Sequence, residues 1–289
     1  MQRLSQYLTF INEKKAALFI GAGISSIAGC LSLKDLCDQL KELKEVEQFL
    51  KGQSSVSPRE VIAFCKSRLT TEKEKQIFAG VMRGGLSPNP EKFWKSFLPF
   101  IRKIKQLKPF PPIITTNVDC CLTITKEFEM NKIFHLKEHM KVTNFNEGGI
   151  FHLHGYIEDS NNQVWDIDDY SKRYIDTDFR NFVLEIFQRY SVLFLGYAFG
   201  DTEFLSLIRK AKKECQQPKP HFALLPSDDC PSGVNEAVYM ELYNIQTIQY
   251  GLKDDFINLF TEWIDSNFSS VAIGRDDQVS FMQRLGEGA

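Results

Sequence analysis

The sequence lacks the paired cysteines of a metal-binding knuckle. It has seven cysteines in 289 residues, but no two of them have Cys-x-x-Cys spacing. Such pairs are the usual sequence signature of a zinc site, and a disulfide framework is typical of small secreted chains. The first residues also form no apolar signal segment. We therefore expect a chain without zinc that works in a reducing cytoplasm.

Excess positive charge and long apolar runs are missing as well. The formal net charge is −2, whereas binding to the phosphate backbone of nucleic acid usually requires a clear basic excess. No apolar run approaches the roughly 20 residues that cross a bilayer. The sequence therefore predicts neither a nucleic-acid footprint nor a membrane segment.

A glycine-rich turn is the clearest local motif. Residues 18–20 are wholly apolar and end at Gly21, Gly23 follows, and Ser25 and Ser26 offer hydroxyl groups where a helix begins. A buried strand, a glycine turn and a helix start in this order are typical of a phosphate site. Glycine turns of this kind also occur for packing reasons, so the motif alone does not decide between the two uses.

Apolar strands alternate with helices through most of the chain. Besides residues 18–20, strand-like runs occupy 113–116, 192–195, 221–225 and 245–248, and shorter ones occupy 132–136 and 149–153. This alternation predicts an α/β fold with a doubly wound, mainly parallel sheet. Residues of about 45–106 read as a helical insertion lobe. We expect a single domain over 1–268 and a linker or tail over 269–289.

Polar segments follow several of these strands. They are Thr115-Thr116-Asn117-Val118-Asp119, Gly196-Tyr197-Ala198-Phe199-Gly200-Asp201 and His154, together with the glycine turn. Parallel sheets bind ligands at the carboxyl ends of their strands. We therefore expect all four segments to lie at one edge of the sheet.

These segments resemble the signatures of the sirtuin superfamily. The matching stretches are Gly-Ala-Gly-Ile-Ser at 21–25, Thr-Thr-Asn-x-Asp at 115–119, His-Leu-His-Gly at 152–155 and Phe-Leu-Gly-Tyr-Ala-Phe-Gly-Asp at 194–201. Within the superfamily, the chain is most similar to bacterial sirtuin-like domains that consume NAD in antiphage defence systems such as Thoeris. The resemblance implies a Rossmann-like sheet and NAD as the substrate.

The resemblance also implies roles for particular residues. Asn117, Asp119 and His154 would be catalytic, with His154 in the place of the family's catalytic histidine. The residues implied to contact NAD are Gly21, Ala22, Gly23, Ser25, Thr116, Gly196, Tyr197 and Phe199. Of these, Gly196, Tyr197 and Phe199 would line the adenosine side.

The chain departs from the protein deacetylases of the superfamily at two places. They carry a zinc-ribbon lobe with two cysteine pairs, whereas the interval between His154 and Gly196 contains no cysteine. They usually have Pro-Asp-Phe-Arg after the first turn, where this chain has Cys30-Leu31-Ser32-Leu33-Lys34. Because the zinc-ribbon lobe forms one wall of the acetyl-lysine channel, water is the simpler acceptor here.

The residue types suit cleavage of a glycosidic bond. Asn117 can donate and accept hydrogen bonds at once, so it can hold a ribose hydroxyl or the attacking water. A neutral His154 near its ordinary pKa can take up the released proton. Asp119 can help to stabilise the cation, although an aspartate after a strand is as often a helix cap.

Several other residues have a structural reading that we prefer. His152 should face away from His154 in an extended strand. The His135 and His139 pair lacks further ligands of a metal site, and Cys120 and Cys121 read as packed thiols. The acidic turn of Asp166, Asp168 and Asp169 reads as a helix cap.

We therefore expect an NAD glycohydrolase that acts as the NAD-depleting effector of an antiphage (abortive infection) system. Such an enzyme must be restrained, so we expect a homo-oligomer or a complex with a sensor or regulator protein. One alternative is a non-catalytic sensor of NAD or an NAD-derived nucleotide. A protein deacylase or ADP-ribosyltransferase is a third hypothesis, which the missing zinc ligands disfavour.

Overall fold

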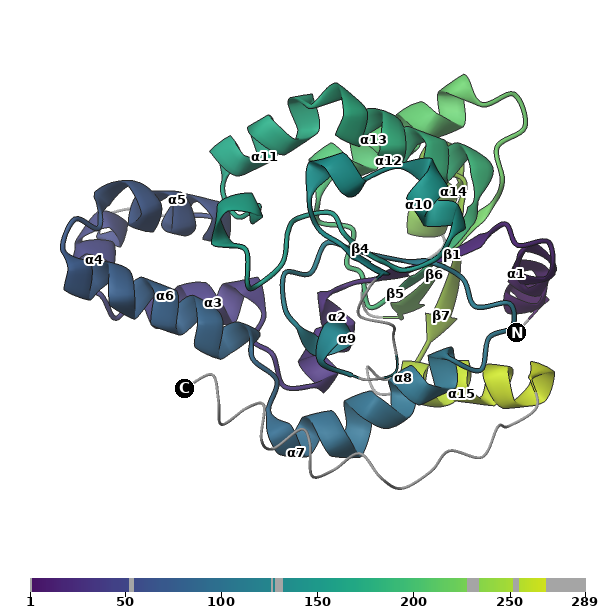
Figure 1. The fold of residues 1–289 in the computed structure, drawn as a ribbon, viewed down its shortest axis with the longest axis horizontal. Helices are drawn as coiled ribbons and strands as arrows, with labels where there is room; N and C mark the ends of the chain where they lie inside the picture. Colours follow the sequence, from purple (N-terminus) through teal and green to yellow (C-terminus); the bar gives the residue numbers. More distant parts are fainter. Residues whose placement is uncertain are drawn as a thin grey trace.

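The computed structural model describes residues 2–51, 55–125, 127, 132–227, 234–251 and 255–268. It shows one parallel sheet with helices on both faces and a helical lobe to one side (Figure 1). The expected tail at 269–289 lies outside the described residues.

All seven strands of the sheet are parallel, in the order β3-β4-β2-β1-β5-β6-β7. Their bounds are β1 Ala16–Ile20, β2 Ile113–Thr115, β3 Ile133–Phe134, β4 Ile150–His152, β5 Ser191–Leu195, β6 His221–Pro226 and β7 Ile245–Tyr250. Ile20 at the end of β1 is in register with Thr115 and with Leu195, and Thr115 is in register with His152. The carboxyl ends of these four strands therefore align, which confirms the predicted doubly wound sheet.

The central strand β1 is buried along its whole length. Its alternate residues serve two cores: Leu18 and Ile20 pack on one face of the sheet, and Ala17 and Phe19 on the other. The first face is covered by α1 (Gln2–Asn12), the π-helical turn η1 (Phe93–Phe97), α8 (Leu98–Ile104) and α15 (Asp255–Asn267). The second is covered by α10 (Val142–Asn146), α12 (Thr177–Arg189), α13 (Thr202–Glu214) and α14 (Val234–Tyr243). A strand covered on both faces is expected to be apolar throughout.

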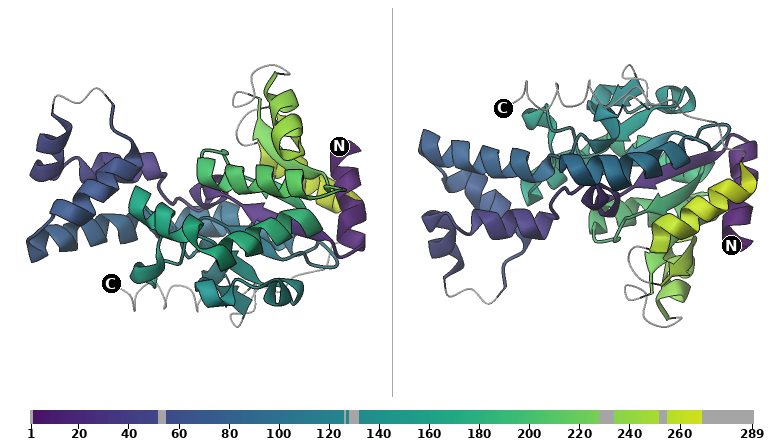
Figure 2. Two further views of the ribbon diagram at one scale, coloured as in Figure 1. Left: turned by 90° about the horizontal axis from the view of Figure 1, so that it is seen from above. Right: turned by 90° about the horizontal axis from the view of Figure 1, so that it is seen from below.

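The helical lobe is formed by α3 (Leu33–Leu40), α4 (Lys44–Leu50), α5 (Pro58–Arg68) and α6 (Glu72–Leu86). It has its own apolar core, which includes Leu36, Leu40 and Ile62, and it projects from the sheet in all three views (Figures 1 and 2). The lobe thus begins and ends earlier than the expected 45–106. The aromatic residues Phe93 and Phe97 belong instead to the core beneath the sheet.

Short elements complete the described chain: α2 (Ala22–Ile27), α7 (Pro90–Lys92), α9 (Cys121–Ile124), the 3₁₀ turns Lys137–His139 and Ser160–Asn162, and α11 (Ile167–Ile175). The helical stretch before β5 is divided into two helices, α11 and α12. Asp176 separates them because its extended backbone ends one helix, while its carboxylate accepts from Phe179 N at 2.9 Å to cap the next. Among the described helices, none has the length and apolar character required to cross a membrane.

Candidate functional site

The glycine turn is packed against the loop that follows β5. Gly23 N donates to the Gly196 carbonyl at 2.9 Å, and Gly21 N donates to the Leu195 carbonyl at 2.9 Å. A Cβ atom at Gly21 would lie 2.4 Å from Gly196 O, and one at Gly23 would lie 2.9 Å from it. The structure thus requires both glycines for the contact between two loops. The N–H group of Gly23 is already engaged by this carbonyl.

Ser25, Asn117 and Asp119 form a buried chain of hydrogen bonds. Asn117 Nδ2 donates to Ser25 Oγ at 2.8 Å, and Ser25 Oγ donates to Asp119 Oδ2 at 2.6 Å. Asp119 Oδ1 accepts from Cys121 N at 2.9 Å, so it also serves the start of α9. Three residues predicted to act in the site therefore lie together, at the ends of β1 and β2.

The position of Asn117 is fixed from both sides. Its backbone N–H donates to Thr115 Oγ1 at 2.9 Å, and Thr115 Oγ1 donates to the Ile20 carbonyl at 2.7 Å. His152 Nδ1 lies 2.9 Å from the Asn117 carbonyl oxygen. His152 is buried, so it has the structural role that we expected, and its role is to hold the Asn117 loop.

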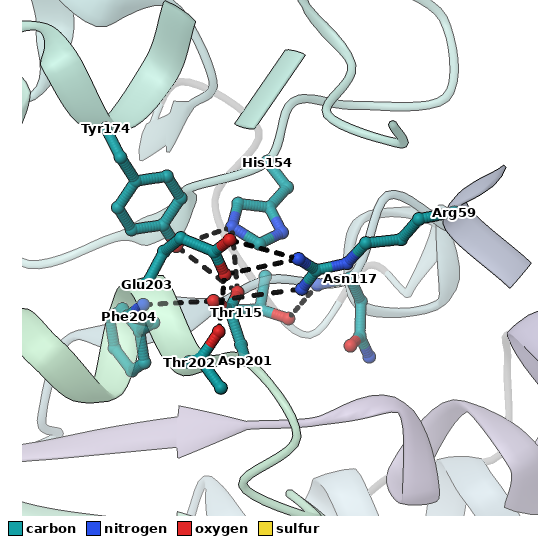
Figure 3. A network of polar contacts seen from close by, with 9 residues as sticks. All are labelled: Arg59, Thr115, Asn117, His154, Tyr174, Asp201, Thr202, Glu203 and Phe204. Atoms are coloured by element: carbon teal, nitrogen blue, oxygen red, sulfur yellow. Dashed lines mark hydrogen bonds and ion pairs between the residues drawn. The ribbon is translucent and has the colours of Figure 1, made fainter. Parts of the chain in front are cut away.

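His154 lies in a second polar network (Figure 3). Its Nε2 is 2.8 Å from the hydroxyl of Tyr174 and 3.5 Å from Asp201 Oδ2. The rings of Tyr170 and Tyr174 meet the imidazole edge-on, at centroid distances of 5.0 and 5.9 Å. In Figure 3 the amide of Asn117 points away from His154, and the described contacts include no direct bond between the two residues. The same edge of the sheet thus holds two networks.

Burial changes the acid–base character of His154. Desolvation lowers the pKa of His154 to about 3, with further lowering by the positive charges of Arg173 and Arg59. The expectation of a pKa near the ordinary value of about 6.5 is therefore wrong, because only 4% of the side chain's surface is exposed. His154 is neutral at neutral pH, but as a base it is weak in this state.

Several residues of the His154 network were not predicted from the sequence, among them Tyr174, Asp201 and Arg59. The sequence showed Asp201 only as the last residue of the 196–201 motif, and no role was assigned to it. Arg59 comes from α5 in the lobe, where its Nη1 lies 3.2 and 3.3 Å from the two carboxylate oxygens of Glu203. Its guanidinium stacks over Tyr170, 3.7 Å from the ring centroid. No sequence pattern marks Arg59, since its partners are more than 100 residues away.

The loop after β5 is rich in aromatic contacts. Phe199 is buried and has a backbone φ of +55°, which is rare for a bulky side chain. Its ring packs against Phe194, Tyr197 and Tyr239 at 4.9 to 5.1 Å. The ring of Tyr197 is similarly packed, but its hydroxyl is buried and has no hydrogen-bond partner among the described residues. Phe199 is therefore placed in the core, whereas Tyr197 retains a free donor.

One group of described residues has the composition of a metal site. The ligand atoms of Cys30, Asp119 and Cys121 lie within 4.8 Å of one another, and the two sulfur atoms are 3.3 Å apart. Both Asp119 oxygens already accept hydrogen bonds. We therefore assign the group to packing and hydrogen bonding. His135 lies outside any helix and 3.5 Å from Asp159, so the helical His135–His139 spacing is not realised.

A separate cavity of about 260 Å³ lies near the amino ends of β2 and β4. Lysines, glutamates and apolar residues line it, among them Lys105, Lys108, Phe110, Lys132 and Ile150. It opens at the opposite edge of the sheet from Asn117 and His154, so it is not part of the candidate site.

The chain was compared with protein families, curated proteins and solved structures, with different results. None of the curated proteins matches this chain. A crystal structure of a Sir2 homolog–NAD complex is similar in fold, with 13% sequence identity over 91% of this chain and 94% of that chain, and a TM-score of 0.46. Residues 111–248 match the model of the family described as the SIR2-like domain. Over these residues, which contain Asn117, Asp119, His154 and Asp201, the chain is similar to a SIR2-like domain, and this supports its resemblance to the sirtuin superfamily.

Proposed function

We propose that the protein is an NAD glycohydrolase that converts NAD and water to nicotinamide and ADP-ribose. The observation that carries the proposal is a buried, neutral histidine at the same sheet edge as an Asn–Ser–Asp hydrogen-bond chain, within a segment that matches the SIR2-like domain. Such an edge, where parallel strands end, is where α/β folds bind their ligands.

The reaction breaks the bond between ribose C1′ and the nicotinamide nitrogen. The electron pair of this bond leaves with nicotinamide, and the ribose passes through a state with cationic character. The oxygen of a water molecule then bonds to C1′, and the water releases one proton. His154 is proposed to receive that proton and pass it to solvent, since a neutral imidazole has one nitrogen free to accept.

The Ser25–Asn117–Asp119 chain is proposed to act on the ribose. Asp119 is buried, with only 4% of the residue's surface exposed, so its negative charge can help to stabilise a nearby cation. Asn117 is proposed to hold a ribose hydroxyl or the water. The remaining cofactor-binding proposals are Ala22, Thr116, Gly196 and Tyr197, and Tyr197 is favoured by its unpartnered buried hydroxyl. The proposed roles require no metal ion.

A second candidate function is binding of NAD, or of a nucleotide derived from it, without turnover. The low pKa of His154, about 3, favours this alternative because a base of that strength accepts a proton poorly at neutral pH. Deacylation has no comparable support in the described residues.

The biological role is proposed from the resemblance described above. An NAD-consuming domain of this type fits the effector of an antiphage system in the bacterial cytoplasm. Its partner would then be a second copy of the chain or a regulator protein that restrains it until infection.

The test is to incubate the purified full chain with NAD, alone and with extract of phage-infected cells, and to follow free nicotinamide. We expect release in at least one condition, and we expect Asn117→Ala and His154→Gln to abolish it while each still binds NAD in calorimetry. His139→Gln is the control because His139 is exposed and none of its described contacts is with the network. Binding of NAD without release in every condition would favour the sensor, and the absence of binding would exclude both functions.

A further inference from the structure

Asp201 is placed to act on His154 with one carboxylate oxygen and on α13 with the other. Its Oδ1 caps the helix by accepting from Phe204 N at 2.9 Å. Its Oδ2 faces away from the helix and lies 3.3 Å from the Tyr174 hydroxyl and 3.5 Å from His154 Nε2. A helix cap requires only Oδ1, so capping does not account for the position of Oδ2.

Tyr174 connects Asp201 to the imidazole and selects its tautomer. An ionised carboxylate can only accept, so the Tyr174 hydroxyl donates to Asp201 Oδ2. The Tyr174 oxygen, 2.8 Å from His154 Nε2, is then the acceptor for an Nε2–H group. A neutral imidazole with its proton on Nε2 has its lone pair on Nδ1. That nitrogen makes no hydrogen bond to any described residue, and in Figure 3 it points toward the side of Arg59 and Asn117.

We propose that Asp201 is the positioning residue for His154. Through Tyr174 it holds the imidazole as the Nε2–H tautomer, which leaves Nδ1 free to take the proton. Its negative charge then lies 3.5 Å from the ring that becomes positive. The proposal deepens the proposed NAD cleavage and rests on it for its kinetic readouts.

Arg59 brings the lobe into the same network. Its Nη2 lies 4.0 Å from Asp201 Oδ1, and its positive charge opposes protonation of His154. The charged and titratable groups that face His154 are Tyr170, Arg173 and Tyr174 on α11, Asp201 and Glu203 at the start of α13, and Arg59 on α5. Among them, Asp201 favours the protonated imidazole, while Arg59 and Arg173 disfavour it. The lobe therefore sets part of the basicity of His154.

The variants separate capping from positioning. Asp201→Asn keeps an N-cap acceptor and the side-chain size but removes the charge, and Asp201→Ser keeps a cap but removes the group that reaches Tyr174. We expect Asp201→Asn to lower kcat by about 10²-fold, the usual scale for general-base catalysis, without a comparable change in KM for NAD. The acid limb of its kcat profile should move to lower pH, because the protonated imidazole loses its counter-charge.

Arg59→Ala should move the same limb in the opposite direction, to higher pH. Lys66→Ala is the matched control. Lys66 is on the same helix and ties the lobe to the start of α11 through Asp166 and Asp169, each at 2.7 Å, but it is not among the groups that face His154. It should leave the profile unchanged. Equal shifts in the Arg59 and Lys66 variants would show that docking of the lobe, and not the charge of Arg59, is responsible.

A second readout does not require NAD. In the ¹⁵N-labelled full chain, the His154 imidazole can be assigned by its loss in His154→Gln, and its nitrogen shifts report the tautomer. We expect Nε2–H in the parent and a changed tautomer balance in Tyr174→Phe and Asp201→Asn. An Asp201→Asn protein with parental kcat, pH profile and tautomer would overturn the positioning role and leave NAD cleavage intact. A parent that never cleaves NAD would refute the proposed function, while the spectra would still decide the role of Asp201.

Discussion

Burial lowers the pKa of three described histidines, and the large shifts of two of them, His154 and His221, give the protein a defined response to acid. Burial lowers the pKa of each of these two to about 3, whereas an unfolded histidine titrates near 6.5. Above about pH 6.5 both the folded and unfolded states are neutral and the full stability is present. Below it the unfolded chain binds protons that the folded state does not, so stability falls with pH until the folded pKa is reached.

We therefore expect the free energy of unfolding to fall by about 2 kcal/mol per buried histidine between pH 7 and pH 5. His221→Asn should reduce this loss by about that amount, since an asparagine does not titrate. The measurement is urea denaturation at both pH values, with a variant of the exposed His139 as the control. An unchanged loss in His221→Asn would mean that His221 is not held neutral.

At the scale of elements, the turn after β1 is defined by its contact with the loop after β5. A side chain at Gly21 would lie 2.4 Å from Gly196 O and 2.6 Å from Tyr197 Cα, both backbone atoms that cannot move aside easily. Gly80, in the middle of α6, has nothing within 4 Å of the corresponding position. A Gly→Ala substitution at these two positions therefore compares a crowded site with an open one.

Gly21→Ala should destabilise the fold by about 1–3 kcal/mol or more, the range of overpacked cores. Gly80→Ala should stabilise it by about 0.5–1 kcal/mol, because alanine loses less conformational entropy in a helix. Guanidinium unfolding of the three proteins is the measurement. If Gly21→Ala unfolds like the parent and only its affinity for NAD falls, the phosphate explanation of this glycine would be correct instead.

For the whole molecule, we predict that the domain is restrained until it assembles or meets its trigger. An active NAD hydrolase drains the cofactor of its host, and the lobe meets the body beside the candidate site through Arg59 and Lys66. Phe93 and Phe97 cannot contribute to a contact surface, since both are buried beneath the sheet. The lobe itself remains available for contact.

This prediction is tested by nicotinamide release at increasing protein concentration, with the oligomeric state followed by light scattering. Dilute monomer should show little turnover, with a large rise on assembly or on addition of the partner. His154→Gln should assemble equally and stay inactive. Full activity in dilute, demonstrably monomeric protein would exclude control by assembly.

The sequence alone determined the sheet and the edge at which the candidate site lies. Apolar runs bounded by glycine, proline or polar residues mark strands because a strand covered on both faces has to be apolar. The helix cap at Asp166 was also predicted, since its partner Asp169 lies only three residues away. Parallel strands place their carboxyl ends together, so Ser25, Asn117, Asp119 and His154 could be assigned to one edge before any coordinate was known.

Only the tertiary structure decided that this edge holds two separate polar networks, and which groups surround His154 in one of them. The contact of Arg59 with Glu203 spans 144 residues, and no local pattern encodes such a distance. The pKa of His154 depends on the surface that α11 and the loop after β5 remove from water, which is a property of packing. The end of the lobe also depends on packing. Phe93 and Phe97 pack in the core beneath the sheet and not in the core of the lobe, and the sequence shows only that these residues are apolar. Contacts between residues a few positions apart can be predicted from the sequence. Burial and contacts between distant residues form only when the chain folds.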